Sequence, residues 1–445
     1  MKRSAWRYLW KSGDIRKKLL ITLGLLAVYR LAANIPVPGI DRAALSSLFS
    51  QGGAASNLVN LLDLLSGGTV SRFSILAMGV YPYITAQIIL QLLTPIIPAL
   101  ERKLKDNPRE GQKWMERWTV ILTVPMAILS AIGQINIFSS LTGGQQILVN
   151  YGFSGSALLP TVTTIVSMIA GTMFAIWLGQ LISEYGIPNQ GLSLIIFSGI
   201  VSRMPAGLFA ILTDTQNGWW LMLVVLAILA LTIFAIVIVQ EGQRNVPVLF
   251  PGRRMGNRMS MPVKSNLPLK VNMAGMIPLI FAQSIMTFPA VVASYFTGSQ
   301  VGWVQSFARS VSNLFGGTSP WYSVIFFFMV VAFTFFYTDV LFTQQNYGEN
   351  LKKQGAQIPG ISRGGPTQRY LTKVQRRITL PGAVFLGLVA VLPSIMSLLL
   401  PVSQGALQLL SAAGMLIVVG VVRDTFNIID TELKLHGYEE SLIKG

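Results

Sequence analysis

The sequence predicts an all-α polytopic membrane protein with ten transmembrane helices. Of the 445 residues, 52% are hydrophobic and only 11% are charged, whereas a soluble domain carries about 25% charged residues. The chain contains ten apolar segments, each near the roughly 20 residues that a membrane-spanning helix needs. Lysine and arginine are concentrated in alternate connections between these segments.

The predicted spans follow one another along the whole chain. A basic start and an apolar run from Leu19 resemble a secretory signal peptide. However, Arg30 lies within the run and no small-residue cleavage site follows, so we predict a retained first span. The ten predicted spans are 18–36, 75–98, 117–137, 158–182, 189–210, 219–240, 271–296, 321–346, 377–399 and 403–425.

The placement of charge predicts the orientation of the spans. The net charge is +17, and six or seven Lys and Arg residues lie in each of the segments 1–18, 99–117, 241–270 and 347–377. The opposite connections hold only Arg42, Arg72 and Arg309, with Arg203 near a span end. The positive-inside rule then places both termini in the cytoplasm.

Ten spans divide into two halves of five, 1–212 and 213–445. Because five is odd, the halves run in opposite directions, as in inverted repeats that enclose a central site. The motif G-x-x-P-x-I occurs in both span 2 and span 7. Its glycine and proline weaken a helix, so the predicted helix breaks are Gly79, Pro82, Gly275 and Pro278. The alternative is two unrelated kinks.

The motif ends in Ile84 and Ile280. Each lies nine residues into its span, about 14 Å from opposite faces and close to the midplane. No carboxylate lies at mid-depth in any predicted span, although ion-coupled transporters usually hold an ionisable group there. A ring of apolar side chains closes a pore by excluding water. The sequence therefore favours a sealed conduit, and lipid-facing or packing roles for these isoleucines are the alternative.

Several catalytic classes are excluded by composition. The chain has no cysteine and one histidine, which excludes disulfides, Cys-ligated metals and a His-rich zinc site. Gly152-Phe153-Ser154-Gly155 matches an intramembrane serine-protease motif, but the only histidine, His436, lies on the other side of the membrane. No phosphate-binding P-loop is present. We therefore expect a protein that is not an enzyme, needs no cofactor and takes energy from a partner.

Segment 37–74 contains a short apolar half-helix. Leu58 to Leu65, followed by Ser66-Gly67-Gly68, is too short to span a membrane. It forms either a re-entrant element buried within the protein or an interfacial helix on the outer leaflet.

Six long strings, in order along the whole chain, resemble the SecY family of protein-conducting channels. They are IPVPGID (35–41), LLSGG with SRFSILAMGVYPYITA (64–86), ISEYGIPNQGLSLIIFSGIV (182–201), LPLKVNMAGMIPLIFA (267–282), ENLKKQGAQIPGI (349–361) and TLPGAVFLGLVAVLP (379–393).

The resemblance implies two pseudo-symmetric halves around an hourglass pore, with a lateral gate between spans 2–3 and 7–8. It implies a pore ring of Ile84, Ile88, Leu192, Ile196, Ile280 and Ile417. It also favours the re-entrant alternative, as a plug at about 57–72 that includes Leu58, Leu61, Leu62, Leu65, Ser66, Gly67 and Gly68.

The resemblance further implies partners in the bacterial plasma membrane and the cytoplasm. These are the small membrane subunits SecE and SecG, the motor ATPase SecA, the ribosome, signal sequences, translocating polypeptides and the phospholipid bilayer. In loop 347–376 the arginine that relatives use for motor coupling is displaced by one residue, to Arg363. The expected partner-binding residues are Arg244, Arg253, Arg254, Arg258, Lys352, Lys353 and Arg363. A secondary transporter and a scaffold or insertase without a through-pore are the rival functions.

Overall fold

Each of the ten predicted spans overlaps a helix. The computed structural model describes residues 13–40, 69–70, 73–106, 108–141, 152, 155–202, 204–205, 209, 218–251, 254–255, 258–259, 263–296, 301–315, 319–399 and 412–435. The helices at the predicted spans are α2 (Gly13–Ala32), α5 (Tyr81–Ile96), α7 (Pro108–Leu141), α8 (Leu158–Tyr185), α9 (Gly191–Val201), α11 (Gly218–Glu241), α12 (Ile277–Phe296), α14 (Pro320–Gln345), α16 (Gly365–Leu399) and α18 (Ala412–Leu435).

Five helices in the described part of the chain are long and apolar enough to cross a membrane. They are Glu110–Ile135, Leu158–Tyr185, Met222–Glu241, Trp321–Lys353 and Gly365–Met396. Two shorter apolar helices, Gly191–Val201 and Ile277–Met286, lie within predicted spans 5 and 7. Prolines such as Pro125 in α7 and Pro381 in α16 lie inside these helices, which membrane helices tolerate better than soluble ones.

The prediction of an all-α protein is wrong for segment 241–270. Strands β1 (Gln243–Phe250) and β4 (Val263–Lys270) pair antiparallel from Gln243↔Lys270 to Phe250↔Val263. Two short strands, β2 (Arg254–Met255) and β3 (Arg258–Met259), pair farther along the same hairpin. The hairpin forms because Val246 and Val248 alternate with exposed residues and bury one face of β1.

Other boundaries differ from the predicted spans. Spans 2 and 7 begin as helices at Tyr81 and Ile277, and the helix of span 10 runs from Ala412 to Leu435 rather than over 403–425. The connections contain further helices that were not predicted from the sequence: α6 (Pro98–Asp106), α13 (Gly302–Phe315) and α15 (Tyr347–Lys353), together with the 3₁₀ turn η1 (Gly155–Ala157).

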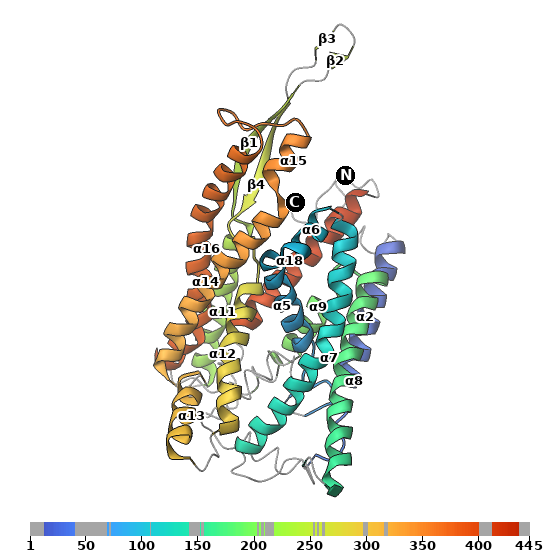
Figure 1. The fold of residues 1–445 in the computed structure, drawn as a ribbon, viewed down its shortest axis with the longest axis vertical. Helices are drawn as coiled ribbons and strands as arrows, with labels where there is room; N and C mark the ends of the chain where they lie inside the picture. The colour runs from blue at the N-terminus through green and yellow to red at the C-terminus, as the bar shows by residue number, and fades with distance from the viewer. Residues whose placement is uncertain are drawn as a thin grey trace.

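The basic connections lie at one end of the helical body. Figure 1 shows α6, the β1–β4 hairpin and α15 at the upper end and α13 at the lower end. These upper elements belong to segments 99–117, 241–270 and 347–376, which carry most of the lysine and arginine of the connections.

The apolar core is divided among several clusters. One joins α7 and α8 to residues 70–78, and another joins α11, α12, α14 and α16 to α18. A third joins α2, α8 and α9 to α18. Helix α18, from the C-terminal half of the sequence, therefore packs against α9 from the N-terminal half.

Candidate functional site

The two G-x-x-P-x-I motifs lie at the beginnings of helices α5 and α12. Gly79 has φ +51° and Gly275 has φ +63°, a left-handed conformation that favours glycine. Pro82 and Pro278 are each the second residue of the following helix, where proline is well tolerated because the N–H groups of the first turn have no intrahelical acceptor. The breaks therefore precede the helices rather than interrupting them.

The start of α12 is fixed by a local turn. The Asn272 side-chain oxygen accepts a hydrogen bond from the Gly275 N–H at 2.9 Å, and its amide nitrogen donates to the Gly275 carbonyl at 3.1 Å. As a result of the two breaks, Ile84 and Ile280 are each the fourth residue of their helices.

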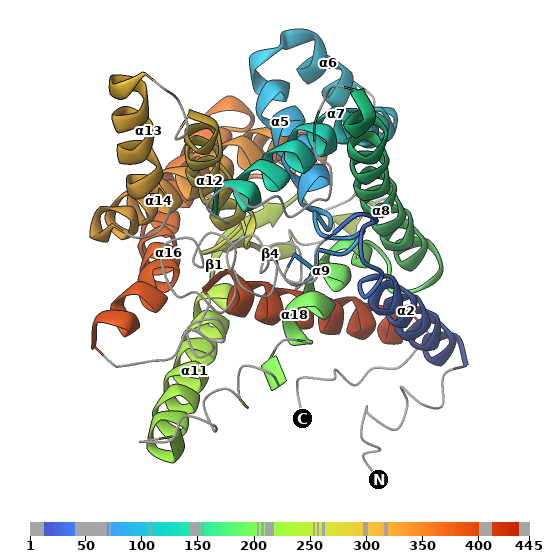
Figure 2. The same cartoon turned by 90° about the horizontal axis from the view of Figure 1, so that it is seen from below.

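Four of the six predicted ring residues lie in one apolar cluster. Ile196 and Ile417 are buried in it, and the half-buried Ile84 and Leu192 pack against it. These side chains come from three helices, α5, α9 and α18. Figure 2 shows α5, α9, α12 and α18 around the middle of the molecule, seen along the helical body.

The other two ring residues, Ile88 and Ile280, are not members of this cluster. Ile88 is buried in a second cluster against which Ile84 also packs, so Ile84 joins the two groups. Ile280 is 5% exposed and lies between Leu279 and Phe281, which belong to different clusters.

A close contact between α8 and α9 positions Leu192 and Ile196. A side chain at Gly191 would collide with the carbonyl of Gly179 on α8. The Gly191 N–H also donates to the Ser183 hydroxyl oxygen at 3.1 Å. Only glycine allows the two helices to approach this closely at the start of α9.

Helices α5, α12 and α14 meet at the predicted lateral gate. Ile88, Phe281 and Tyr337 form an apolar cluster there. The Phe281 ring stacks on Phe333 at 5.7 Å between centroids. The Tyr337 hydroxyl donates to the side-chain oxygen of Gln91 on α5 at 3.2 Å. This hydrogen bond, which sequence reasoning missed, joins α14 to α5 across the contact.

The predicted plug residues lie outside the described residues. This applies to Leu58, Leu61, Leu62, Leu65, Ser66, Gly67 and Gly68. Next to them, Val70 and Phe73 are buried in the cluster with α7 and α8. The Thr69 hydroxyl donates to the Leu76 carbonyl at 2.6 Å.

The predicted partner-binding residues lie on two segments that the structure joins. The Leu249 N–H donates to the Gln357 carbonyl at 2.8 Å, and the Gln357 N–H donates to the Leu249 carbonyl at 2.9 Å. Val248 of β1 and Ile358 share one apolar cluster beneath this bridge. We call residues 243–250, 263–270 and 347–363 the basic platform.

The charged side chains of the platform are exposed. Arg244, Lys352 and Lys353 face solvent, and Arg363 donates from Nε to the Gln357 side-chain oxygen at 3.3 Å. Arg253 lies outside the described residues, and only the backbones of Arg254 and Arg258, on β2 and β3, are described.

The six predicted ring positions carry no side chain suited to covalent chemistry. Within the described residues, no three His, Asp or Glu side chains are grouped so that they could hold a metal ion. The ring positions carry only isoleucine and leucine. Apolar side chains that pack together in this way exclude water from their own contact.

Comparisons with known proteins agree over nearly the whole chain. The SecY family model matches residues 74–426. The protein translocase subunit SecY of Streptomyces scabiei is 36% identical over 444 residues, covering 98% of this chain and 99% of that protein. The same subunit of Escherichia coli K12 is 36% identical over 438 residues, covering 97% and 95%.

Solved structures show the same fold. The structure of a protein-conducting channel aligns with a TM-score of 0.61 and 14% identity, over 99% of this chain and 100% of that one. A structure from work on the plug domain of SecY aligns with a TM-score of 0.60 and 14% identity, over the same shares. On the family match and the close relatives, the chain belongs to the SecY family.

Proposed function

We propose that the chain is a passive conduit that carries unfolded secretory polypeptides across the bacterial plasma membrane. The observation that carries this proposal is the apolar cluster that joins Ile84, Leu192, Ile196 and Ile417 from three helices. Six such side chains form a gasket around an extended chain, and the same apolar surfaces keep water out at rest. As a member of its family, the chain is a channel subunit and not an enzyme.

Hydrophobic segments leave the conduit sideways into lipid, between α5 and α7 on one side and α12 and α14 on the other. The Gln91–Tyr337 hydrogen bond and the apolar packing of Ile88 on α5 with Phe281 and Tyr337 hold this contact closed. These are few interactions, and the hydrogen bond contributes only about 1 kcal/mol. A hydrophobic signal sequence can therefore replace them with its own apolar contacts.

The basic platform docks the partner that supplies the energy. Its exposed cations suit acidic patches on a motor such as SecA or the phosphates of ribosomal RNA. The small subunits SecE and SecG complete the complex in the membrane. In this arrangement the platform and both termini face the cytoplasm, as the positive-inside rule requires.

Polar substitution on α12 tests the seal. Ile280 and Ile285 lie on the same helix, but Ile280 is 5% exposed and Ile285 is 39% exposed. Ile280→Asn should raise the resting ion conductance of the full chain in planar bilayers because the asparagine lets water enter the ring. Ile285→Asn is the matched control and should leave the conductance unchanged. Equal conductance for the two folded variants would contradict the seal.

Charge reversal in the stretch of sequence that connects the platform strands β1 and β4 tests the docking role. Arg253→Glu with Arg254→Glu should weaken the binding of motor or ribosome to the chain in nanodiscs, and added salt should weaken binding to the unmodified chain. Binding that is insensitive to both changes would contradict the docking role while leaving the seal intact. Ion-gradient-driven uptake of a small solute into liposomes would instead support the transporter alternative.

A further inference from the structure

The outward face of α16 changes from basic to apolar along a single line. At 100° per residue, the exposed side chains of this face fall within an arc of about 100°. Three exposed cations come first, and exposed aliphatic side chains follow toward the end of the helix. We call this set the α16 stripe: Arg369, Lys373, Arg377, Leu380, Val384 and Leu388.

The opposite face of α16 holds the helix in this orientation. Leu371, Val374 and Ile378 are buried in the cluster beneath the hairpin. The buried Gln375 amide donates to the Lys270 carbonyl at 3.2 Å and to the Thr379 hydroxyl oxygen at 3.3 Å. Because this inner face is fixed, the cations of the stripe cannot turn away from the surface.

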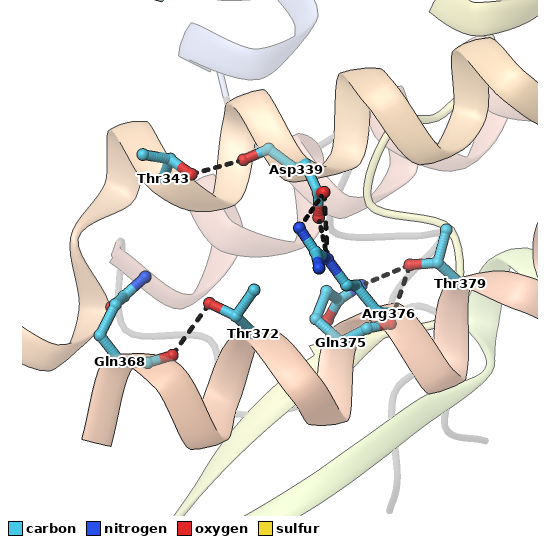
Figure 3. Close-up of polar contacts among 7 residues, drawn as sticks. All are labelled: Asp339, Thr343, Gln368, Thr372, Gln375, Arg376 and Thr379. Carbon is cyan, nitrogen blue, oxygen red and sulfur yellow. Dashed lines mark hydrogen bonds and ion pairs between the residues drawn. The ribbon is translucent and has the colours of Figure 1, made fainter. Parts of the chain in front are cut away.

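A neighbouring arginine of α16, Arg376, has its charge neutralised by an ion pair. Arg376 makes a two-pronged ion pair with Asp339 of α14, with nitrogen–oxygen distances of 2.8 to 3.2 Å (Figure 3). In contrast, Arg369, Lys373 and Arg377 form no ion pair or hydrogen bond with any described residue. The stripe therefore presents positive charges without partners within the described part of the chain.

The dimensions of the stripe match one leaflet of a bilayer. From Arg377 to Leu388 the helix rises about 16 Å, and half of the hydrocarbon core is about 15 Å. Leu380, Val384 and Leu388 are 56%, 37% and 53% exposed, on a helix apolar enough to cross the membrane. The cations of the stripe therefore lie at the level of the lipid headgroups, and its aliphatic side chains lie at the depth of the acyl chains.

We propose that the α16 stripe binds an anionic phospholipid in the leaflet on the hairpin side. The lipid phosphate lies on Lys373 and Arg377, with Arg369 adding to the local positive potential. One acyl chain lies along Leu380, Val384 and Leu388. Charge complementarity selects an anionic lipid over a zwitterionic one, and continuity with the lipid-facing surface selects a lipid over a soluble partner.

Lipid-borne quenchers test this site directly. Because the chain has no cysteine, Leu380→Cys gives one attachment point for a fluorophore. The full chain is reconstituted in phosphatidylcholine vesicles that contain a small fraction of a nitroxide-labelled lipid. Two such lipids are compared, which carry the nitroxide on the same acyl carbon but have either a phosphatidylglycerol or a phosphatidylcholine headgroup. The phosphatidylglycerol lipid should quench the fluorophore at a several-fold lower mole fraction than the phosphatidylcholine lipid.

Neutralisation tests the cations one at a time. Lys373→Gln and Arg377→Gln should each reduce the preference for the phosphatidylglycerol quencher over the phosphatidylcholine quencher by up to about fivefold. This factor corresponds to roughly 1 kcal/mol per cation. Lys264→Gln is the matched control, because it removes an equal charge from exposed β4 and should leave the preference unchanged. A fluorophore at Leu231, which is 71% exposed on α11, should show equal quenching by both lipids.

Three results would overturn the proposal. One is equal quenching by the two lipids at position 380, and another is a preference that survives the double variant Lys373→Gln with Arg377→Gln. The third is the same preference at position 231, which would mean that anionic lipid gathers around the whole protein. Size-exclusion profiles and helical content confirm that each variant is folded before it is compared.

Discussion

Tyr337→Phe is expected to ease the opening of the lateral gate. The change keeps the aromatic ring, which lies 5.9 Å from Phe281, and removes only the hydroxyl that donates to Gln91 at 3.2 Å. A hydrogen bond of this kind contributes about 0.5–1.5 kcal/mol. If opening breaks it, the open-to-closed ratio should rise roughly twofold to thirteenfold, with about fivefold as the central value.

The assay is the binding of a fluorescent signal peptide to the full chain in nanodiscs. If the peptide binds only the open gate, its apparent affinity rises by the same factor as the open population. Tyr322→Phe is the control, because Tyr322 lies on the same helix, stacks on Phe326 and has no hydroxyl partner within the described residues. Unchanged affinity for Tyr337→Phe, or an equal gain for Tyr322→Phe, would refute the reasoning.

A double-mutant cycle separates the hydrogen bond from other effects. Gln91→Leu removes the acceptor and should also raise peptide affinity. The double variant Gln91→Leu with Tyr337→Phe should then show less than the sum of the two single changes, because the same bond is lost in each. Strict additivity would mean that the two side chains act independently of each other.

Three further predictions concern packing and charge. Gly191→Ala should destabilise the chain by about 1–3 kcal/mol, because the added methyl group overpacks against α8. Thermal unfolding in detergent measures the loss. Gly365→Ala is the control and should not destabilise the chain, because the space around Gly365 is open. Lys18→Gln should cost less than about 1 kcal/mol, because its 2.6 Å ion pair with Glu432 is partly exposed, and exchanging the two charges should restore the loss. Val248→Asp buries a carboxylate between the hairpin and Ile358 and should speed amide exchange in β1; unchanged exchange would contradict the apolar attachment of the platform.

Long apolar segments made most of the helices predictable. A span needs only length and hydrophobicity, which are local properties, so each predicted span overlaps a helix. Hydropathy could not show where the helices of spans 2 and 7 begin, because residues 75–80 and 271–276, which precede them, are also largely apolar. Gly79 and Gly275 marked the breaks, and the positive φ at each shows why the helices begin after them.

The hairpin left a weaker sequence signal that was missed. Val246 and Val248 are separated by one residue, Pro247, and Gly256-Asn257 is a turn-forming pair, but the segment was predicted only as a basic connection. Helix α13 was missed because it is shorter than a span, although its apolar residues recur at helical spacing. Both elements lie in connections between spans, where the length and hydrophobicity that identify a span do not apply.

Contacts between distant segments were not predictable from residue patterns alone. Ile84 and Ile417 are 333 positions apart in sequence, yet they share one cluster. The inverted repeat indicated only that Ile84 and Ile280 lie at matching depth. The bond between Gln91 and Tyr337 and the bridge between Leu249 and Gln357 depend on tertiary packing, which no local signal specifies.

The central claim is that a polypeptide passes through the apolar ring. The direct measurement places one cysteine at Ile280 of the cysteine-free chain and tests disulfide crosslinking to a stalled secretory chain that carries one cysteine of its own. The account predicts a crosslink at Ile280 and none at Leu388, which is exposed on α16. A folded, membrane-inserted Ile280→Cys variant that forms no crosslink, or forms one no better than Leu388→Cys, would contradict it.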